Sequence, residues 1–355
     1  MGKPPRVAIM VLNYNGLKWI PTCLASVAKT EYENFSVYLV DNGSTDGSVD
    51  YVKSSFPRVK IIQHPTNLGF AEGYNRAVEE IEADCLVLLN NDTEVLNPGW
   101  VKELVNVAGT DPEIAAVACK IVSMENHSCL DSVGGMGIPF WRGFVDVGHG
   151  EPDRGQYDVA GFEPFAFCGG AALVRLGAFR RLGGFDGSLF MYVEDADLSW
   201  RMRLSGYRIG YASKARVAHY LSGSASSREI DARKLYYCHR NLLATILRNC
   251  GSSLRWAFRN YFLFSFMMIA GFSIYEPEKS IAAVKAIIWN ILNLRDTCIR
   301  RLRIQADRVE NEAEILISMY PRLTRHQPAQ HATLRHMLNI LFEYSQLSRL
   351  SSWRR

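Results

Sequence analysis

Short apolar runs alternate with segments of helical periodicity through the first third of the chain. The apolar runs predict buried strands, and the segments between them predict helices. The expected strands are Val7–Leu12, Ser36–Val40, Val59–Ile62, Cys85–Leu89 and Ala115–Cys119, and the expected helices are Leu17–Ala28, Ser48–Ser54, Gly73–Ile81 and Trp100–Ala108. Nearly continuous apolar strands that alternate with helices predict a Rossmann-like α/β fold, with a mostly parallel sheet covered by helices on both faces.

The pattern changes twice farther along the chain. Residues 123–165 are rich in Gly, Asp and aromatic residues and show little periodicity, which predicts a long functional loop region. Apolar order returns at Phe165–Val174, and the stretch Ser222–Ser227 has the composition of a linker. We therefore expect an α/β domain over residues 1–223 and a helical C-terminal extension over residues 224–355.

Polar side chains follow the expected strands at their carboxyl ends, where open α/β sheets bind ligands. Asn13 and Asn15 follow the first strand, Asp41 ends the second, and the triplet Asn90-Asn91-Asp92 follows the fourth. Asp41 can accept hydrogen bonds from a base or a ribose, and the triplet offers hard oxygen ligands for Mg²⁺ or Mn²⁺. Local turns and helix caps would use the same residue types. The sequence contains neither GxGxxG nor GxxxxGK[ST], so we expect neither a nicotinamide dinucleotide site nor a P-loop.

The segment Phe185–Tyr207 is the most informative part of the chain. It places four carboxylates among aromatic and apolar residues: Asp186, Glu194, Asp195 and Asp197. Neighbouring carboxylates repel and burial raises their pKa, so such a cluster is more typical of a functional site than of a scaffold. The structural alternative is a helix that begins here, with Asp195 or Asp197 as its cap.

Composition limits the compartment and the partners. The net charge of +4 is small for 355 residues and gives no reason to expect a nucleic acid partner. The eight cysteines include no CxxC pair, so neither a zinc site nor a disulfide framework is expected. The first residues lack the features of a signal peptide. These observations favour the reducing cytoplasm.

Taken in order, the motifs resemble glycosyltransferase family 2, and they are closest to the branch that includes bacterial rhamnosyltransferases. The resemblance runs from Val7 to about Asn241 and rests on the blocks Val11–Asn15, Val40–Asp46, Asn67–Ala71 with Gly73 and Asn75, Leu88–Thr93, Phe167–Ala171 and Gly184–Arg201. It implies the GT-A fold and an inverting transfer from a nucleotide sugar. The QxxRW motif of processive relatives is absent, so synthesis of a long homopolymer is not expected.

The resemblance also implies roles for individual residues. Asp195 matches the catalytic base, with Glu194 beside it. Asp92 and His219 match the ligands of a Mg²⁺ or Mn²⁺ ion, although Asn90 stands where the family usually has a first Asp and leaves the metal one charge fewer. The implied nucleotide-sugar contacts are Asn13, Asn15, Asp41, Asn67, Asn75, Asn91, Gly169 and Gly170, with Arg240 near the diphosphate.

We therefore expect a dTDP- or UDP-sugar as the donor and a glycan or lipid-linked hydroxyl as the acceptor. Glu194 and Asp197 are expected to orient the acceptor or to raise the pKa of Asp195 by like charge. Trp141 and Arg142 are expected to shape the acceptor side. One alternative is a catalytically silent sugar-nucleotide or glycan-binding module. A nucleotidyltransferase would need a Gly-rich basic loop after the first strand, which this sequence does not have.

The C-terminal extension carries its own pattern. Asn260–Tyr275 is free of charge but shorter than the roughly 18–20 residues of a spanning helix. Aromatic-rich apolar stretches with basic residues around them, over residues 252–303, are typical of an interfacial anchor. We expect peripheral attachment at the cytoplasmic face of a membrane. The alternative is that these helices pack on the first domain or pair two subunits.

Overall fold

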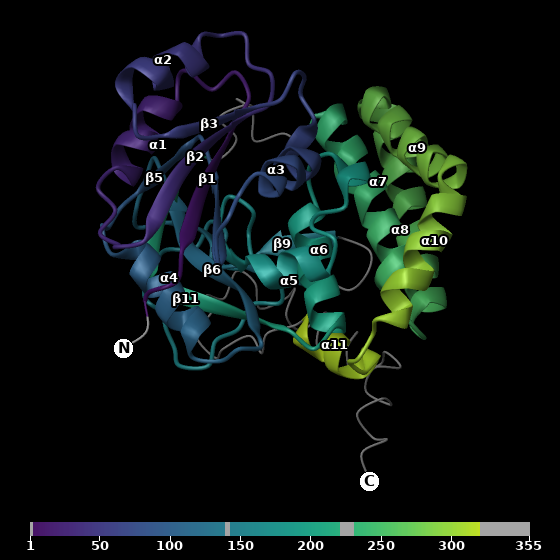
Figure 1. The fold of residues 1–355 in the computed structure, drawn as a ribbon. Coiled ribbons are helices and arrows are strands. Elements are labelled where there is room, and N and C mark those ends of the chain that lie inside the picture. Colours follow the sequence, from purple (N-terminus) through teal and green to yellow (C-terminus); the bar gives the residue numbers. More distant parts are fainter. Residues whose placement is uncertain (1–2, 139–142, 221–230, 320–355) are drawn as a thin grey trace.

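The computed structural model describes residues 3–138, 143–220 and 231–319 (Figure 1). The strands are β1 (Val7–Asn13), β2 (Phe35–Asp41), β3 (Lys60–Gln63), β4 (Cys85–Asn90), β5 (Thr93–Val95), β6 (Ile114–Ser123), β7 (Leu130–Ser132), β8 (Gly135–Ile138), β9 (Gly143–Asp146), β10 (Ala171–Arg175) and β11 (Arg208–His219). The helices are α1 (Ile20–Val27), α2 (Ser48–Ser55), α3 (Gly69–Glu79), α4 (Trp100–Gly109), α5 (Leu176–Arg181), α6 (Glu194–Leu204), α7 (Ala232–Asn249), α8 (Leu254–Tyr275), α9 (Pro277–Leu292), α10 (Leu294–Ala306) and α11 (Glu312–Ser318), with a 3-10 turn at Gly187–Leu189.

The main sheet has the strand order β3-β2-β1-β4-β10-β6-β11-β5, and β7 pairs with β6 outside this path. The strands β3, β2, β1 and β4 are parallel. Strand β10 runs antiparallel between β4 and β6, and β5 runs antiparallel to β11. The predicted α/β fold is confirmed, and each strand and helix expected in the first third of the chain is present. Parallel pairing places the polar ends of β1, β2 and β4 at one edge of the sheet.

Alternate residues of the strands supply two hydrophobic cores, one on each face of the sheet. In β1, Ile9 belongs to the core that packs against α1 and α4, and Met10 belongs to the core that packs against α3, α5 and α6. Both side chains are fully buried. This alternation is the two-residue period of a strand, and covered faces explain why the strands read as continuous apolar runs.

Residues 123–165 are not the long loop that their composition suggested. They contain β7 and the antiparallel hairpin of β8 and β9. Glycines at positions 135, 137 and 143 interrupt the apolar alternation of the hairpin, so its strands leave little signal in the sequence. Trp141, Arg142 and the expected linker Ser222–Ser227 lie outside the described residues.

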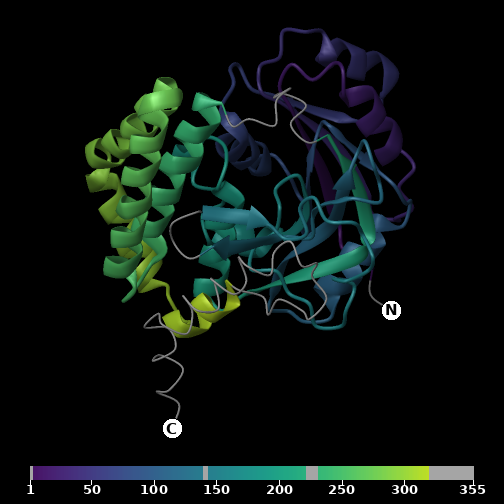
Figure 2. The ribbon, with the colours of Figure 1, turned by 180° about the vertical axis from the view of Figure 1, so that it is seen from behind.

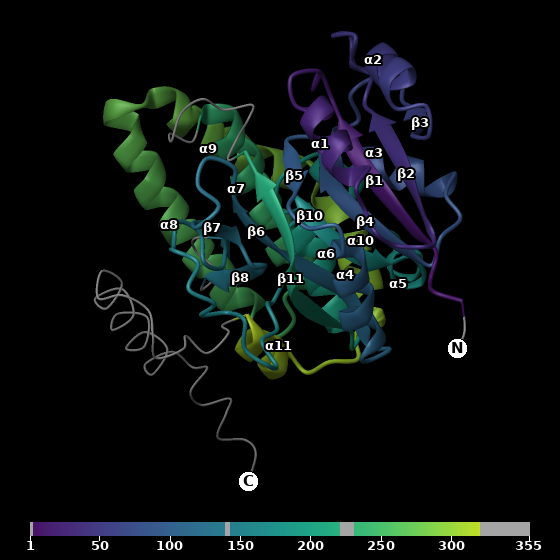
Figure 3. The ribbon, with the colours of Figure 1, turned by 90° about the vertical axis from the view of Figure 1, so that its left-hand side faces the viewer.

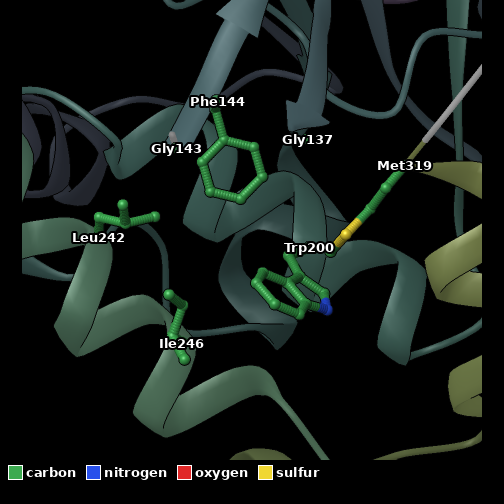
Figure 4. Close-up of a pocket in the computed structure, with 7 residues that line it drawn as sticks. All are labelled: Gly137, Gly143, Phe144, Trp200, Leu242, Ile246 and Met319. Atoms are coloured by element: carbon green, nitrogen blue, oxygen red, sulfur yellow. The ribbon is translucent and has the colours of Figure 1, made fainter. Parts of the chain in front are cut away.

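The C-terminal helices stand side by side on one flank of the sheet domain (Figures 1 and 2). A third hydrophobic cluster joins them to it, with Trp200 of α6, Leu242 and Ile246 of α7 and Tyr261 of α8 among its members. Figure 4 shows Phe144 of β9 and Trp200 facing Leu242 and Ile246 across a gap of only about 10 Å³. The hairpin, α6 and α7 therefore pack as one apolar unit, with no space there for a ligand.

Buried charges add a second link between α7 and the sheet domain. The guanidinium of Arg248, at the end of α7, is fully buried and pairs with the carboxylate of Asp186. Arg300 of α10 lies 3.1 Å from the same carboxylate. Burial alone would raise the pKa of Asp186, but the two guanidinium groups hold it below its ordinary value. Asp186 is thus a structural member of the acidic cluster.

Replacing Arg248 by methionine should therefore destabilise the protein strongly, because the buried carboxylate of Asp186 would keep Arg300 but lose its other charged partner. We expect Arg248→Met to lower the free energy of unfolding by about 3 kcal/mol, the lower end for breaking a buried pair, since Arg300 remains. Urea unfolding measures the change. Arg295→Met, at an exposed position of α10, is the matched control. Equal stability of the two variants would contradict a stabilising role for the buried ion pair of Arg248 and Asp186.

Candidate functional site

The carboxyl ends of β1, β2 and β4 are joined by side-chain hydrogen bonds. Asn13 donates through Nδ2 to Asp41 Oδ1 at 3.1 Å, and Asn91 donates through Nδ2 to Asn13 Oδ1 at 2.8 Å. A Cβ added at Gly16 would lie 1.9 Å from Asn91 Nδ2, so only glycine allows this close approach. Three predicted donor-binding residues from three separate strands thus share one network.

The loop after β2 is shaped by the same network. Asp41 is fully buried and accepts hydrogen bonds from the backbone amides of Gly43 and Ser44 through Oδ2. Asn15 is exposed, and its Oδ1 accepts a hydrogen bond from the amide of Thr45 at 2.8 Å. Asn13 and Asp41 therefore shape the loop from within, and Asn15 lies on its surface. Their contacts with a base and a ribose stay predictions.

The block from Asn67 to Asn75 packs against the segment that precedes the acidic cluster. Asn67 Oδ1 accepts a hydrogen bond from the amide of Gly69. Asn75 binds the backbone of Phe185 twice, donating to its carbonyl at 2.8 Å and accepting from its amide at 2.9 Å. The side chain of Asn75 is thereby committed to the protein. These bonds give Asn75 a scaffolding role, and its contact with the donor stays a prediction.

Asp92 and His219 meet because β5 pairs antiparallel with β11, which places His219 opposite Thr93. His219 Nε2 lies 3.4 Å from Asp92 Oδ1. On its other side, Nδ1 lies 2.7 Å from Oδ2 of Asp131 in β7. Burial alone would lower the pKa of His219, but the hydrogen bonds with Asp131 and Asp92 raise it to about 10.

This pair fits a divalent metal ion bound together with a diphosphate. The donor set is a carboxylate oxygen and an imidazole nitrogen, and Asp131 fixes the ring so that Nε2 faces Asp92. Because the raised pKa keeps the ring protonated near neutral pH, binding of the ion would release the proton of Nε2. Among the described residues, no group of three or more His, Cys, Asp or Glu side chains is placed to hold a metal. The remaining ligands would therefore come from the diphosphate and water.

Two consecutive glycines connect this metal candidate to the predicted base. The carbonyl of Gly170 accepts a hydrogen bond from the amide of Asn90 at 3.0 Å. The amide of Gly169 donates to Asp195 Oδ2 at 2.9 Å. A Cβ at Gly169 would lie 2.9 Å from the ring of Phe70, so a larger residue there would press on this ring, while its distance of 3.5 Å from Asp195 Oδ2 is an ordinary contact. The two glycines thus touch both the Asn90-Asn91-Asp92 triplet and the predicted base, and the expected contacts of Gly169 and Gly170 with a nucleotide sugar stay predictions.

Asp195 is the member of the acidic cluster that can act as a base. Its carboxylate is half-buried, and besides the amide of Gly169 it accepts a hydrogen bond from the amide of Ala196 at 2.7 Å. Burial raises its pKa above the ordinary 3.8, against the opposing effect of these amides. The three acids occupy the first turn of α6, so the helix start expected as an alternative is present as well.

Glu194 and Asp197 have different environments from Asp195. Glu194 is buried, its Oε2 has no hydrogen-bond partner among the described residues, and burial with the charges of Asp195 and Asp197 raises its pKa well above 4.5. Asp197 is buried and binds Arg201 Nε at 2.8 Å and Asn249 Nδ2 at 3.0 Å. Asp197 cannot reach an acceptor. The expectation that like charge raises the pKa of Asp195 is wrong, because burial is the cause.

Arg240 binds the backbone of the segment before the acidic cluster. Its Nη2 donates to the carbonyls of Ser188 and Leu189 at 3.0 and 2.7 Å, and its side chain is buried. Its contact with the diphosphate stays a prediction. Asn241, the next residue, binds the same segment. The resemblance to the family places Asn241 together with Arg240 in a late motif near the diphosphate, whereas Asp131 received no role from the sequence, where its only signal was an acid close to a Gly-rich stretch.

Comparison with known proteins adds the family. Residues 8–183 match the family model described as Glycosyl transferase family 2. The chain is 30% identical over 243 residues to the O-antigen biosynthesis protein RfbC of Myxococcus xanthus. The aligned region covers 64% of this chain and only 18% of that protein. It is 27% identical over 243 residues to the N-acetylglucosaminyl-diphospho-decaprenol L-rhamnosyltransferase of Mycobacterium tuberculosis, covering 61% of this chain and 76% of that one.

A solved structure has the same architecture. The mannosyltransferase from Pyrobaculum calidifontis, in complex with GDP-Man and Mn²⁺, aligns with a TM-score of 0.50 and 17% identity over 89% of this chain and 86% of its own. At this identity the likeness concerns the fold. Together with the matched family model and the ordered motifs at one sheet edge, it shows that residues 8–183 of the chain belong to a glycosyl transferase family 2 domain with the GT-A fold.

Proposed function

We propose that the protein is an inverting, non-processive glycosyltransferase, which moves a sugar from a nucleoside-diphosphate sugar to a hydroxyl group of a glycan or a lipid-linked acceptor. The observation that carries the proposal is the carboxylate of Asp195, which is half-buried and fixed by the amide of Gly169 next to the donor motif. The similarity to an L-rhamnosyltransferase favours rhamnose, and hence a dTDP-sugar over a UDP-sugar.

Each group has one task in this reaction. The loops after β1 and β2, built on Asn13 and Asp41, hold the nucleoside. Asp92 and His219 would hold Mg²⁺ or Mn²⁺, which supplies positive charge to the departing diphosphate. Asp195 takes the proton from the acceptor hydroxyl while that oxygen attacks the anomeric carbon from the face opposite the diphosphate. This attack inverts the configuration of the sugar.

Two differences separate an enzyme from a silent binding module on the same fold. A binding module needs the nucleoside loops alone, whereas this chain also holds a carboxylate with a raised pKa beside them. A module would release no nucleoside diphosphate from sugar nucleotides. Release from one member of a panel of sugar nucleotides, with acceptor present, therefore decides between the two.

We further propose that the protein attaches to the cytoplasmic face of a membrane through its C-terminal helices. Among the described residues, α8 is long and apolar enough to cross a membrane, with a mean hydropathy of 1.3. One side of α8 packs into the protein through Ala257, Tyr261 and Ser265, so the helix is suited to lie on the surface of a bilayer. It lies at the outer edge of the molecule (Figure 3). Apolar side chains dominate the exposed side, with Leu263, Phe266, Met267, Ile274 and Tyr275 among them.

Asp195→Asn should fold normally, bind the donor and lose at least about 10²-fold in turnover, the lower end of what a positioned base contributes. The pKa of Asp195 lies above its ordinary 3.8. In the wild type, turnover should fall as the pH drops through this pKa, because only the ionised carboxylate accepts a proton. Steady-state assays of diphosphate release measure both effects. Asp50→Asn, at an exposed position of α2, is the control. Near-normal turnover of Asp195→Asn would refute the assignment of the base.

Removing the metal should abolish activity, and either Mg²⁺ or Mn²⁺ should restore it. Asp92→Ala should weaken donor binding when metal is present and leave binding unchanged in chelator, because the lost carboxylate acts through the ion. Isothermal titration calorimetry with the nucleoside diphosphate, with and without metal, measures the difference. Full activity in excess chelator would show that the site works without an ion.

Purified protein should co-sediment with anionic liposomes at low salt, since Arg255 and Arg259 are exposed near the start of α8 and its later turns expose apolar side chains. Charged substitutions on that face, Phe266→Glu with Ile274→Glu, should abolish most of this binding, because both side chains are exposed and their replacement leaves the core intact. Thr110→Glu, beyond the end of α4, is the control. Failure of the wild type to bind would leave α8 an oligomeric or structural role.

A further inference from the structure

The backbone just before the catalytic acids is strained. Phe190, Tyr192 and Val193 have φ values of 64°, 66° and 70°, in the left-handed region that residues with a Cβ seldom occupy. The conformation is least favourable for Val193, whose side chain is β-branched. Val193 is also the residue from which α6 starts, so this conformation sets the direction in which Glu194 and Asp195 leave the turn. Strain of this kind persists only where the surroundings hold it in place.

One side chain of α7, that of Asn241, makes three hydrogen bonds to this segment. Asn241 Nδ2 lies 2.8, 2.8 and 2.7 Å from the carbonyl oxygens of Leu189, Met191 and Tyr192. Asn241 is fully buried, so it exchanges none of these bonds for water. The orientation of its amide is fixed because Oδ1 accepts a hydrogen bond from Arg240 Nε at 2.8 Å.

The C-terminal helices in turn hold Arg240 and Asn241 in place. The guanidinium of Arg240 lies 4.8 Å from the ring centre of Tyr237 and 4.5 Å from that of Trp289 in α9. Asn290 of α9 donates to the carbonyl of Arg240 at 2.9 Å. On the other side, the ring of Phe190 stacks on Tyr237 with centroids 5.4 Å apart. The strained turn is therefore supported by α7 and α9 and not by the sheet domain alone.

We propose that Asn241 is a positioning residue for glycosyl transfer, which keeps Phe190, Tyr192 and Val193 at positive φ so that Asp195 faces the sugar site. The proposal rests on the proposed function and adds to it that the C-terminal extension contributes to catalysis. Asn241 touches neither donor nor acceptor in this role. Its effect should therefore appear in turnover and not in the binding of the nucleotide.

The matched pair of variants is Asn241→Ala and Gln305→Ala. Both remove a side-chain amide that donates to backbone carbonyls of the protein, but Gln305 of α10 binds the carbonyls of Arg248 and Asn249, outside the segment before Asp195. Asn241→Ala should lower kcat at least about 10-fold, since small displacements of a catalytic group are costly, while the Kd of the nucleoside diphosphate changes less than about threefold. Gln305→Ala should lower the melting temperature and keep its kcat. Equal kcat values for the two variants would overturn the proposal.

A suppressor tests the same idea through the backbone. Glycine adopts a positive φ without a Cβ penalty, so Val193→Gly in the Asn241→Ala background should restore part of the lost kcat. If Asn241→Ala folds poorly, the double variant should also regain soluble protein. A double variant that is no better than Asn241→Ala would contradict the proposal, because relief of strain would then be irrelevant.

Hydrogen exchange separates this proposal from the proposed function. In Asn241→Ala the amides of residues 188–195 should exchange faster than in the wild type, and in Gln305→Ala they should not. Absence of any transfer by the wild type would refute the proposed function, while the exchange result would still decide whether Asn241 holds the segment. Unchanged exchange in Asn241→Ala would overturn the proposal whatever the activity.

Discussion

Three carboxylates within the first turn of α6 share a region with little water, and the surrounding structure has to accommodate each of them. Asp197 is neutralised by Arg201 and accepts a further hydrogen bond from the amide of Asn249. Glu194 is buried without a charged partner, which raises its pKa and favours the protonated form. Asp195 alone combines partial exposure with hydrogen bonds from backbone amides, and it stays available for proton transfer. Similar side chains thus acquire different chemistry from their environments.

This arrangement makes the C-terminal helices part of the site. Four side chains of α7 reach into the segment from Asp186 to Asp197: Arg240, Asn241, Arg248 and Asn249. They bind backbone carbonyls, the carboxylate of Asp186 and the carboxylate of Asp197. Loss of α7 would leave buried acceptors unpaired, which costs more than the net gain of an ordinary hydrogen bond. The extension is thus a structural requirement of the site, and any role at a membrane is additional.

The sequence predicted the parts of the site that depend on strand ends. Asn13, Asp41 and Asn91 come together because parallel strands end at one edge, which the apolar runs already indicate. Asn75 and Arg240 carried family-like signals, yet they bind backbone groups about 110 and 50 residues away. No local pattern encodes such long-range pairs. The hairpin β8–β9 was missed because its glycines erase the alternation, and Asp131 was missed with it.

In the proposed reaction, Asp195 faces the sugar of a donor whose diphosphate is held near Asp92 and His219. A crystal structure with manganese and the preferred nucleotide sugar tests this geometry directly. We expect the ion to be bound by Asp92 and His219 Nε2, and the Asp195 carboxylate to lie on the face of the sugar opposite the diphosphate. A nucleotide bound away from the ends of β1, β2 and β4, or a sugar that Asp195 cannot approach from that face, would contradict it.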